Sequence, residues 1–591
     1  MECKKYPQML MDWFSKFSDR NKVLVLCIFV SLISGFCAII LKSAVHYTQT
    51  LLQNAFSEEQ FNYLYLAFPI IGITLTVLFV KFFIKDDLSH GVSKILYSIA
   101  KDEGKLKKHH TYSSMISSTL TVGFGGSVGL EAPITLTGSA IGSQLGSFFG
   151  LNTKSTITLV ACGSTAAVAC IFNAPIAGVV FAIEVLMLDL TISSLMPLLV
   201  SAVTGTSISY LILGRSLMFN PMTIPNFKME NLPIYLILGV FTGLYAVYFM
   251  RTSQWIERKM AKIKMKFLRI IIGGILLSIL IFFFPSFYGE GYDAIDAILQ
   301  KDIHKLFINS PFYGFQYQEY LLLVFLFLLL MLKTFATAFT TGAGGIGGVF
   351  APSLFLGGIA GCFVATFCNT LFSCDLSILS FTLAGMVGVM GSIMKAPFTA
   401  IFLIADISGG YQLFLPLIIT VVASYAVFSL FEKYSVYTKS LAETGNLITH
   451  HKDKHALSRL DVNNLIENNF VSLPPDATLR NLVDAIASST RNIFPIVDDA
   501  KNFYGIIVLD DVRKIIFAPE QYDKVSAKEL SFMPDISIEP DELIADVAEK
   551  FKKTDYYNMI VLDKNNKYYG FISRANLFSS YRQIVEEISE D

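Results

Sequence analysis

The sequence predicts an all-α membrane protein built from two repeats of broken helices, followed by a soluble α/β region. Three observations support this fold class. The 591 residues are 53% hydrophobic and only 16% charged, which is too apolar for a soluble enzyme of this length and fits a polytopic membrane protein. The apolar segments fill residues 22–437 and stop near residue 440. A glycine pattern in the first half of this region recurs in the second half.

The composition divides the chain into a polar N-terminal segment, two membrane repeats, a polar linker and two copies of an α/β module. In this order they cover residues 1–22, 23–232, 233–439, 440–458, 459–522 and 523–591. Lysines and arginines precede the first apolar helix, and further basic clusters lie at 101–108 and 251–269. Because positive residues concentrate on the cytoplasmic side of membrane proteins, we expect the N-terminus and these clusters to be cytoplasmic.

The internal repeat is aligned by two Ala-Pro pairs, at 132–133 and 351–352. Glycines then match without a gap: Gly123, Gly125, Gly126, Gly129, Gly138 and Gly142 fall on Gly342, Gly344, Gly345, Gly348, Gly357 and Gly361. Helices broken at membrane depth are tolerated only where they are buried in protein or line a water-filled path. Such repeats are typical of transporters, whose site lies where the repeats meet. The residues alone leave open whether the repeats are inverted or parallel.

Glu131 is the carboxylate of the first glycine-rich loop, and Phe350 stands at the matching place in the second loop. An ionisable residue inside a membrane segment is a candidate functional residue, because a charge facing lipid is costly. Each loop also opens a helix, whose free N–H groups and dipole favour an anion. We therefore expect two helix N-termini to share one anion site, where Glu131 competes with the mobile anion.

Other classes of site are not predicted. The G-x-G-x-x-G pattern at 342–347 follows an apolar helix instead of a strand, which excludes a dinucleotide fold. No nucleophile–base pair, Walker-type loop or metal-ligand spacing occurs, so we predict neither an enzyme nor a metal site. The histidines at 450, 451 and 455 are interpreted as a solvated linker. The net charge of −1, without a basic–aromatic stripe, does not indicate nucleic-acid binding.

The motifs together resemble those of the CLC family of chloride channels and anion/proton exchangers. The family's G-[KR]-E-G-P motif, which carries its gating glutamate, corresponds to residues 129–133, and its G-x-F-x-P motif to residues 348–352. The family's F-N-A-P-x-A-G segment is present at 172–178, and Tyr437 matches the tyrosine that caps the central anion. The resemblance implies inverted repeats, a homodimer, one anion pathway per subunit, and N- and C-termini on the cytoplasmic side. The expected location is the plasma (inner) membrane.

The resemblance implies that Glu131 is the gate of an anion pathway. The anion-binding positions are then His90, Gly91, Ala132, Val349, Phe350 and Tyr437. His90 departs from the family's G-S-G-I-P motif by replacing the serine that binds the central anion; an imidazole donates a hydrogen bond when neutral and is charged when protonated. The alternative is that His90 lies outside the path. Leu130 replaces the basic residue before the glutamate, and Ala132 replaces a glycine.

The proton route of the family's exchangers is incomplete in this sequence. The internal glutamate of that route corresponds to Val185, which carries no proton. Glu184 is a possible substitute, and the alternative is a structural contact with a helix end; Asp406 is its repeat partner. Val185 favours passive conduction, whereas the retained Glu131 keeps coupled exchange open.

The C-terminal copies resemble CBS domains, whose nucleotide site reads G-h-x-[ST]-x-x-[ND]. The second copy fits with Gly570, Ser573 and Asn576. The first copy has Val508 at the hydroxyl position and Asp511 at the acid position. The resemblance implies a possible adenine-nucleotide site, and the alternative is a structural, dimerising pair.

The sequence therefore predicts transmembrane conduction of small anions, above all chloride, gated by a glutamate in the pore. The alternatives are a proton-coupled anion exchanger and a membrane-anchored nucleotide sensor. No cofactor is required; bicarbonate, nitrate and fluoride remain open as the physiological anion. The expected partners are membrane lipid, a second copy of the chain and small anions.

Overall fold

The computed structural model divides the chain into two compact units, Met1–Leu447 and Ile448–Asp591. The described residues are 18–53, 63–88, 91–187, 191–214, 219, 227–315, 318–443, 460–554 and 556–590. The first unit consists of helices, and the second combines short strands with helices. This confirms the predicted fold class, an all-α region followed by an α/β region.

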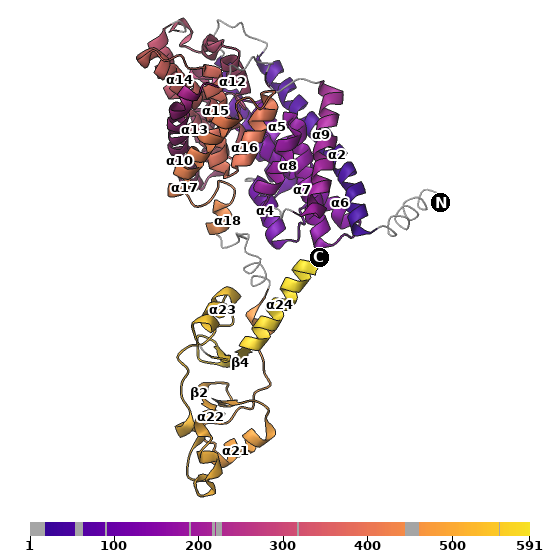
Figure 1. Cartoon of the computed structure of the whole chain (residues 1–591), viewed down its shortest axis with the longest axis vertical. Coiled ribbons are helices and arrows are strands. Elements are labelled where there is room, and N and C mark those ends of the chain that lie inside the picture. The colour runs from indigo at the N-terminus through magenta and orange to yellow at the C-terminus, as the bar shows by residue number, and fades with distance from the viewer. Residues whose placement is uncertain are drawn as a thin grey trace, which may run out of the picture. The chain divides into compact units, whose positions relative to one another are not determined.

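The long helices of the first unit form two series that follow the internal repeat (Figure 1). The first series is α2 (Asp19–Gln53), α3 (Phe68–Phe79), α4 (Gly91–Lys101), α5 (Ser113–Gly123), α6 (Glu131–Phe148), α7 (Thr153–Phe172), α8 (Pro175–Glu184) and α9 (Ile192–Leu213). The second is α10 (Leu232–Ala261), α11 (Lys266–Phe283), α12 (Tyr292–Leu299), α13 (Glu319–Ala343), α14 (Phe350–Phe372), α15 (Ile378–Met394), α16 (Pro397–Ile407) and α17 (Phe414–Phe431). Each helix of the first series has a counterpart at the same place in the second.

Short elements connect these helices. They are the 3₁₀ turns η2 (Tyr63–Leu66), η4 (Lys108–Thr111), η5 (Met229–Asn231), η6 (Pro285–Phe287), η7 (Ile303–Phe307) and η8 (Tyr313–Phe315), the π-helical turn η3 (Val80–Ile84), and the helix α18 (Lys439–Glu443). Nine helices in the described part of the chain are long and apolar enough to cross a membrane. The first unit is therefore a multi-pass membrane body.

Matching glycines bring α6 against α7 and α14 against α15 at backbone contact distance. A Cβ atom on Gly138 would lie 2.3 Å from the carbonyl oxygen of Gly163, and one on Gly357 would lie 2.4 Å from that of Gly385. Any side chain at these positions would push the helices apart, because small residues are what allow such close approach in membranes. This packing fixes α6 and α14, whose first turns form the candidate site.

The second unit contains two copies of a strand–strand–helix module. The strands pair antiparallel, β1 (Ile493–Val497) with β2 (Phe503–Val508) and β3 (Asn558–Leu562) with β4 (Tyr568–Ser573). The helical elements are α20 (Val462–Leu465), α21 (Leu479–Ser488), α22 (Leu509–Val512), η9 (Ile515–Phe517), η10 (Pro519–Gln521), η11 (Ala527–Leu530), α23 (Ile544–Lys553) and α24 (Arg574–Glu590). Both strand pairs shift register at the same point, between Ile496 and Val497 and between Val561 and Leu562.

The two copies exchange segments between their apolar cores. Val462 and Leu465, at the start of the first copy, pack in the core of the second copy around Val547. Ala527, at the start of the second copy, packs in the core of the first around Phe494. A third apolar cluster joins the copies: Phe470, Phe503, Ile506, Ile560, Leu562 and Phe571. The pair is therefore one interlocked body.

Candidate anion pathway

The two glycine-rich loops pair with each other across a local two-fold axis. The backbone N–H of Gly129 donates to the carbonyl of Gly348, and the N–H of Gly348 donates to the carbonyl of Gly129, both at 2.8 Å. These residues match in the repeat alignment, and they pair antiparallel. The two loops therefore run in opposite directions and bring the N-termini of α6 and α14 together, as expected for inverted repeats.

Two threonines reinforce this pairing in the same reciprocal way. The N–H of Ser127 donates to Oγ1 of Thr340 at 3.1 Å, and the N–H of Ile346 donates to Oγ1 of Thr121 at 3.0 Å. All four residues are buried. Because an unpaired N–H is costly in a membrane interior, these hydroxyls stabilise both loops. These threonines were not predicted as site residues, although the repeat alignment places Thr121 opposite Thr340.

Glu131 is the first residue of α6 and is only 2% exposed. Its Oε1 accepts a hydrogen bond of 2.5 Å from the hydroxyl of Tyr292, the first residue of α12. Its Oε2 has no hydrogen-bond partner among the described residues. A Cβ atom on Gly129 would lie 2.0 Å from this oxygen and 3.1 Å from the backbone nitrogen of Ala351. The carboxylate therefore lies where α6 and α14 converge.

The other predicted loop residues surround this point. Ala132 is buried and would contact Cβ atoms built on both Gly348 and Gly91. Val349 is the N-cap residue of α14 and is half-buried. Phe350 is buried, and its ring stacks on that of Phe172 with centroids 5.1 Å apart. The structure thus brings the two loops and the F-N-A-P segment to one place.

A third helix N-terminus reaches the same region from α4. Gly91 is its first residue, and a Cβ atom there would lie 2.9 Å from the carbonyl oxygen of Ala132. His90 lies outside the described residues. Ser93 Oγ donates to the backbone carbonyl of Tyr437 at 2.8 Å, and Tyr437 is close enough to Glu131 for the two side chains to interact electrostatically. Gly91, Ala132 and Tyr437 therefore belong to one site.

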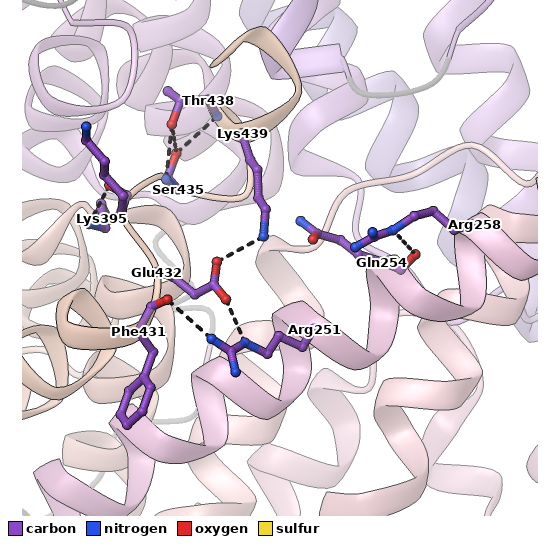
Figure 2. A network of polar contacts seen from close by, with 10 residues as sticks. Arg251, Gln254, Arg258, Lys395, Phe431, Glu432, Ser435, Thr438 and Lys439 are labelled. Carbon is purple, nitrogen blue, oxygen red and sulfur yellow. Dashed lines mark hydrogen bonds and ion pairs between the residues drawn. The ribbon is translucent and has the colours of Figure 1, made fainter. Parts of the chain in front are cut away.

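A polar network holds the segment that carries Tyr437 (Figure 2). Glu432 accepts hydrogen bonds from Nε of Arg251 at 2.8 Å and from Nζ of Lys439 at 2.9 Å. Ser435 and Thr438 cap each other, with N–H to hydroxyl distances of 3.0 and 3.2 Å. Although partial burial opposes it, the hydrogen bonds from Arg251 and Lys439 lower the pKa of Glu432. These contacts fix the loop between α17 and α18.

Glu184 and Asp406 are engaged at helix N-termini. Glu184, the last residue of α8, accepts hydrogen bonds from the N–H groups of Phe398 (3.1 Å) and Thr399 (2.7 Å) in the first turn of α16. Asp406 of α16 accepts a longer hydrogen bond of 3.5 Å from the N–H of Ala177 in the first turn of α8. Val185, next to Glu184, is buried. The two acids therefore cap each other's helices.

Glu290 and Lys333 are ionisable residues near the site that were not predicted from the sequence. Glu290 Oε1 accepts from the N–H of Leu130 at 3.3 Å, and its charge interacts with that of Glu131. Lys333 is 0% exposed, and its Nζ has no hydrogen-bond partner in the described part of the chain. Its Nζ lies 4.7 Å from the ring centroid of Phe355, and its charge interacts with Glu290. The sequence could have identified Lys333 as a candidate functional residue, because it is the one charged residue between Glu319 and Asp375.

Comparison with protein families decides which family the membrane unit represents. A family described as Voltage gated chloride channel matches residues 72–429. The chain belongs to the voltage-gated chloride channel family. A family described as CBS domain matches residues 462–518 and 527–582. Both resemblances seen in the sequence are thereby confirmed.

Curated relatives of this voltage-gated chloride channel family member include channels and exchangers. A putative chloride channel protein ClcB-like from Ralstonia nicotianae is 28% identical over 63% of this chain and 84% of its own length. The chloride channel protein CLC-f from Arabidopsis thaliana is 24% identical over 73% of this chain and 61% of its own length. The H(+)/Cl(-) exchange transporter ClcA from Vibrio cholerae is 27% identical over 55% of this chain and 67% of its own length.

Solved structures share the fold. A slow cyanobacterial Cl-/H+ antiporter matches with a TM-score of 0.61 and 24% identity, covering 71% of this chain and 97% of that one. A eukaryotic CLC transporter matches with a TM-score of 0.60 and 15% identity, covering 94% of this chain and 97% of that one. At these identities the likeness supports the CLC fold alone.

The CBS pair of this channel-family chain contains a polar pocket of about 620 Å³. Its lining residues are Glu467, Asn468, Asn469, Arg491, Ser573, Ala575, Asn576 and Ser579. Glu467 accepts hydrogen bonds from Ser573 Oγ at 2.5 Å and from Arg491 at 2.6 Å. A Cβ atom on Gly570 would lie 2.7 Å from the carbonyl oxygen of Glu467. Asp511, in the first copy, is not among the lining residues.

Proposed function

We propose that this protein carries small anions, above all chloride, across the membrane along a pathway gated by Glu131. The observation that carries the proposal is the position of this carboxylate. It is buried at the N-terminus of α6, beside the N-terminus of α14, with one oxygen held by Tyr292 and the other without a partner in the described chain. Converging helix N-termini favour an anion, so the carboxylate stands where a mobile anion would bind.

The gate works by competition between two anions. Deprotonated Glu131 occupies the anion site and closes the pathway; its protonation, or displacement by chloride, opens it. Backbone N–H groups carry only partial positive charges. They therefore bind chloride weakly enough for the site to release it again. In this proposal Val349, Phe350 and Gly91 contribute backbone N–H groups, and Tyr437 borders the anion on the cytoplasmic side.

The passive channel is the form of transport that we favour. Val185 is apolar and buried at the position of the exchangers' internal glutamate, and neighbouring Glu184 accepts three hydrogen bonds from Phe398 and Thr399. A carboxylate used to cap a helix is poorly placed to shuttle protons. Coupled exchange is the second candidate, and the ionisable groups Glu290 and Lys333 beside the gate are the observation that favours it.

Family membership supports a proposal for the assembly. We propose a homodimer in the plasma membrane, with both termini in the cytoplasm and one pathway per subunit. The CBS pair would bind an adenine nucleotide in the pocket at Ser573 and Asn576. Glu467 now holds the Ser573 hydroxyl, so a phosphate group would have to displace this carboxylate to reach Arg491.

Flux from proteoliposomes tests the proposal. Chloride efflux and proton movement are recorded together for the full chain, with nitrate, bicarbonate and fluoride as competing anions. We expect chloride efflux without coupled proton uptake, and the Glu184→Gln variant should behave like the natural chain. Proton movement driven by a chloride gradient would contradict the passive channel and support the proton-coupled exchanger. The absence of flux for every anion would exclude both.

A further inference from the structure

Asp86, His109 and His110 form a cluster outside the predicted membrane spans. Asp86 follows the π-helical turn η3, and both histidines belong to the short helix η4. One potential ligand atom from each residue lies within 4.8 Å of the other two. Two imidazoles and one carboxylate are donors suited to zinc and similar transition metals.

His109 is oriented as metal-binding histidines commonly are. Its Nε2 lies 3.1 Å from Oδ2 of Asp86, and its Nδ1 lies 3.2 Å from Oγ of Ser113. A ligating histidine typically gives its second nitrogen to a hydrogen-bond partner, which fixes the ring. When Nδ1–H donates to Ser113, Nε2 presents its lone pair toward Asp86.

His110 contributes a buried nitrogen that lacks a partner. The residue is 4% exposed, and its Nδ1 makes no hydrogen bond within the described residues. Buried polar atoms are nearly always paired with protein, water or an ion. A buried imidazole nitrogen without a hydrogen-bond partner is a candidate metal ligand.

Lys107 currently supplies the positive charge beside Asp86. Its Nζ lies 2.8 Å from Oδ2 of Asp86, and its side chain is 67% exposed, so it can move into solvent. Zinc bonds of roughly 2 Å place neighbouring ligand atoms roughly 3.3 Å apart, so modest contraction of the cluster completes the geometry.

We propose that Asp86, His109 and His110 bind one Zn²⁺ ion in place of the Lys107 ammonium, with water completing the coordination. Their spacing in sequence hid the site, because Asp86 lies far upstream of the adjacent histidines and matches no metal-binding motif.

The position of the site connects it to the anion pathway. Asp86 lies on the segment that enters α4, whose first residue is Gly91. The backbone carbonyl of His110 accepts a hydrogen bond of 3.3 Å from Thr137 of α6, the helix that begins with Glu131. A bound ion would tie the entry of α4 to η4 and α6. If the proposed function is right, we expect a bound Zn²⁺ to slow anion flux by holding these elements together.

Zinc binding is measured on the full-length chain, purified without a histidine tag, by competition with a chromophoric chelator. We expect one Zn²⁺ per chain, and at least a tenfold weaker affinity in Asp86→Asn and in His110→Ala. The control replaces the linker histidines with alanine and should bind normally; these are His450, His451 and His455. Unchanged affinity in both cluster variants, or loss of binding in the linker control, overturns the site.

Lys107→Met provides an independent test that leaves all three proposed ligands in place. It removes the competing ammonium while keeping a long side chain, so we expect tighter Zn²⁺ binding than in the natural chain. A merely structural cluster predicts no gain, and weaker or equal binding would contradict the proposal.

Chloride efflux tests the effect on transport. Zn²⁺ should slow efflux from proteoliposomes of the natural chain and leave Asp86→Asn unaffected. Binding without inhibition overturns the link to the pathway. A chain that binds zinc but moves no anion under any condition refutes the proposed function instead, so the two failures are distinguishable.

Discussion

The glycine-rich loops of the two repeats have matching backbones but different side chains. Gly129 and Gly348 exchange equal hydrogen bonds, and Thr121 and Thr340 play reciprocal roles. Where the first loop has Glu131, however, the second has Phe350, so only the first loop carries a carboxylate at this position, and Tyr292 binds it. Polar groups that have an equivalent in the other repeat stabilise the fold. Those without an equivalent are the candidates for function.

The same distinction separates the buried acids and bases of the membrane unit. Glu184 and Asp406 match each other and cap each other's helices. Glu290 and Lys333 form the second pair, and the alignment places Lys333 opposite Ser114, which is not ionisable. Symmetry therefore assigns a structural role to the first pair and points to the second pair as part of the gate.

The largest effect on transport is expected from Glu131→Gln, which removes the charge that breaks the symmetry. The neutral amide cannot close the anion site as a carboxylate does, so chloride flux should rise by about tenfold, equivalent to about 1.4 kcal/mol of barrier. Its dependence on pH through this residue should disappear. Flux is measured from proteoliposomes between pH 4 and 8. Phe350→Leu, at the matching position, is the control and should keep the natural pH profile. A pH dependence that survives in Glu131→Gln would exclude Glu131 as the gate.

The next effect concerns the symmetric threonines. Thr121→Val and Thr340→Val keep the side-chain shape but leave a buried N–H, of Ile346 or Ser127, without its acceptor. Each should lower the stability of the membrane unit by about 1–3 kcal/mol, without changing the pH profile of flux. Thr121→Val should be the more harmful, because Thr76 also loses a hydroxyl partner at 3.0 Å. Thermal unfolding in detergent checks this order, and a stable variant with an altered pH profile would contradict the structural role.

The sequence alone was sufficient to predict the parts of the site that the two repeats share. Glycines and Ala-Pro pairs mark where backbones touch and where helices begin, so the repeat alignment predicted the paired loops around Glu131. It was insufficient for Tyr292, the first residue of α12, and for Glu290 in the turn before it, because both reach the gate from outside the two aligned loops. The threonines were missed for a different reason. A threonine hydroxyl in an apolar helix normally donates to a backbone carbonyl of its own helix. Only the fold shows that it also accepts a hydrogen bond from an N–H of the other loop.

A smaller effect should follow from Glu290→Gln. Removing a negative charge near Glu131 makes the deprotonated gate easier to form, because like charges disfavour each other. Opening by acid should therefore require a lower pH, by about one unit. The nearby groups that also influence Glu131 are Tyr292, Tyr437 and, through Glu290, Lys333. Asp293→Asn removes the same charge at an exposed position and should shift the profile less. An equal shift in both variants would mean that only the overall surface charge matters.

The smallest effect is expected in the CBS pair, where the two copies differ as the loops do. The second copy has Ser573 at the hydroxyl position, and the first has Val508. Glu467→Gln removes a carboxylate that both holds Ser573 and repels phosphate, so adenine-nucleotide affinity should rise by about fivefold, equivalent to roughly 1 kcal/mol. Ser573→Ala should weaken binding, and Val508→Ala should leave it unchanged. Titration of the full-length chain with ATP measures all three. If Val508→Ala alters affinity while Ser573→Ala does not, the nucleotide occupies the first copy, and the pocket beside Arg491 is structural.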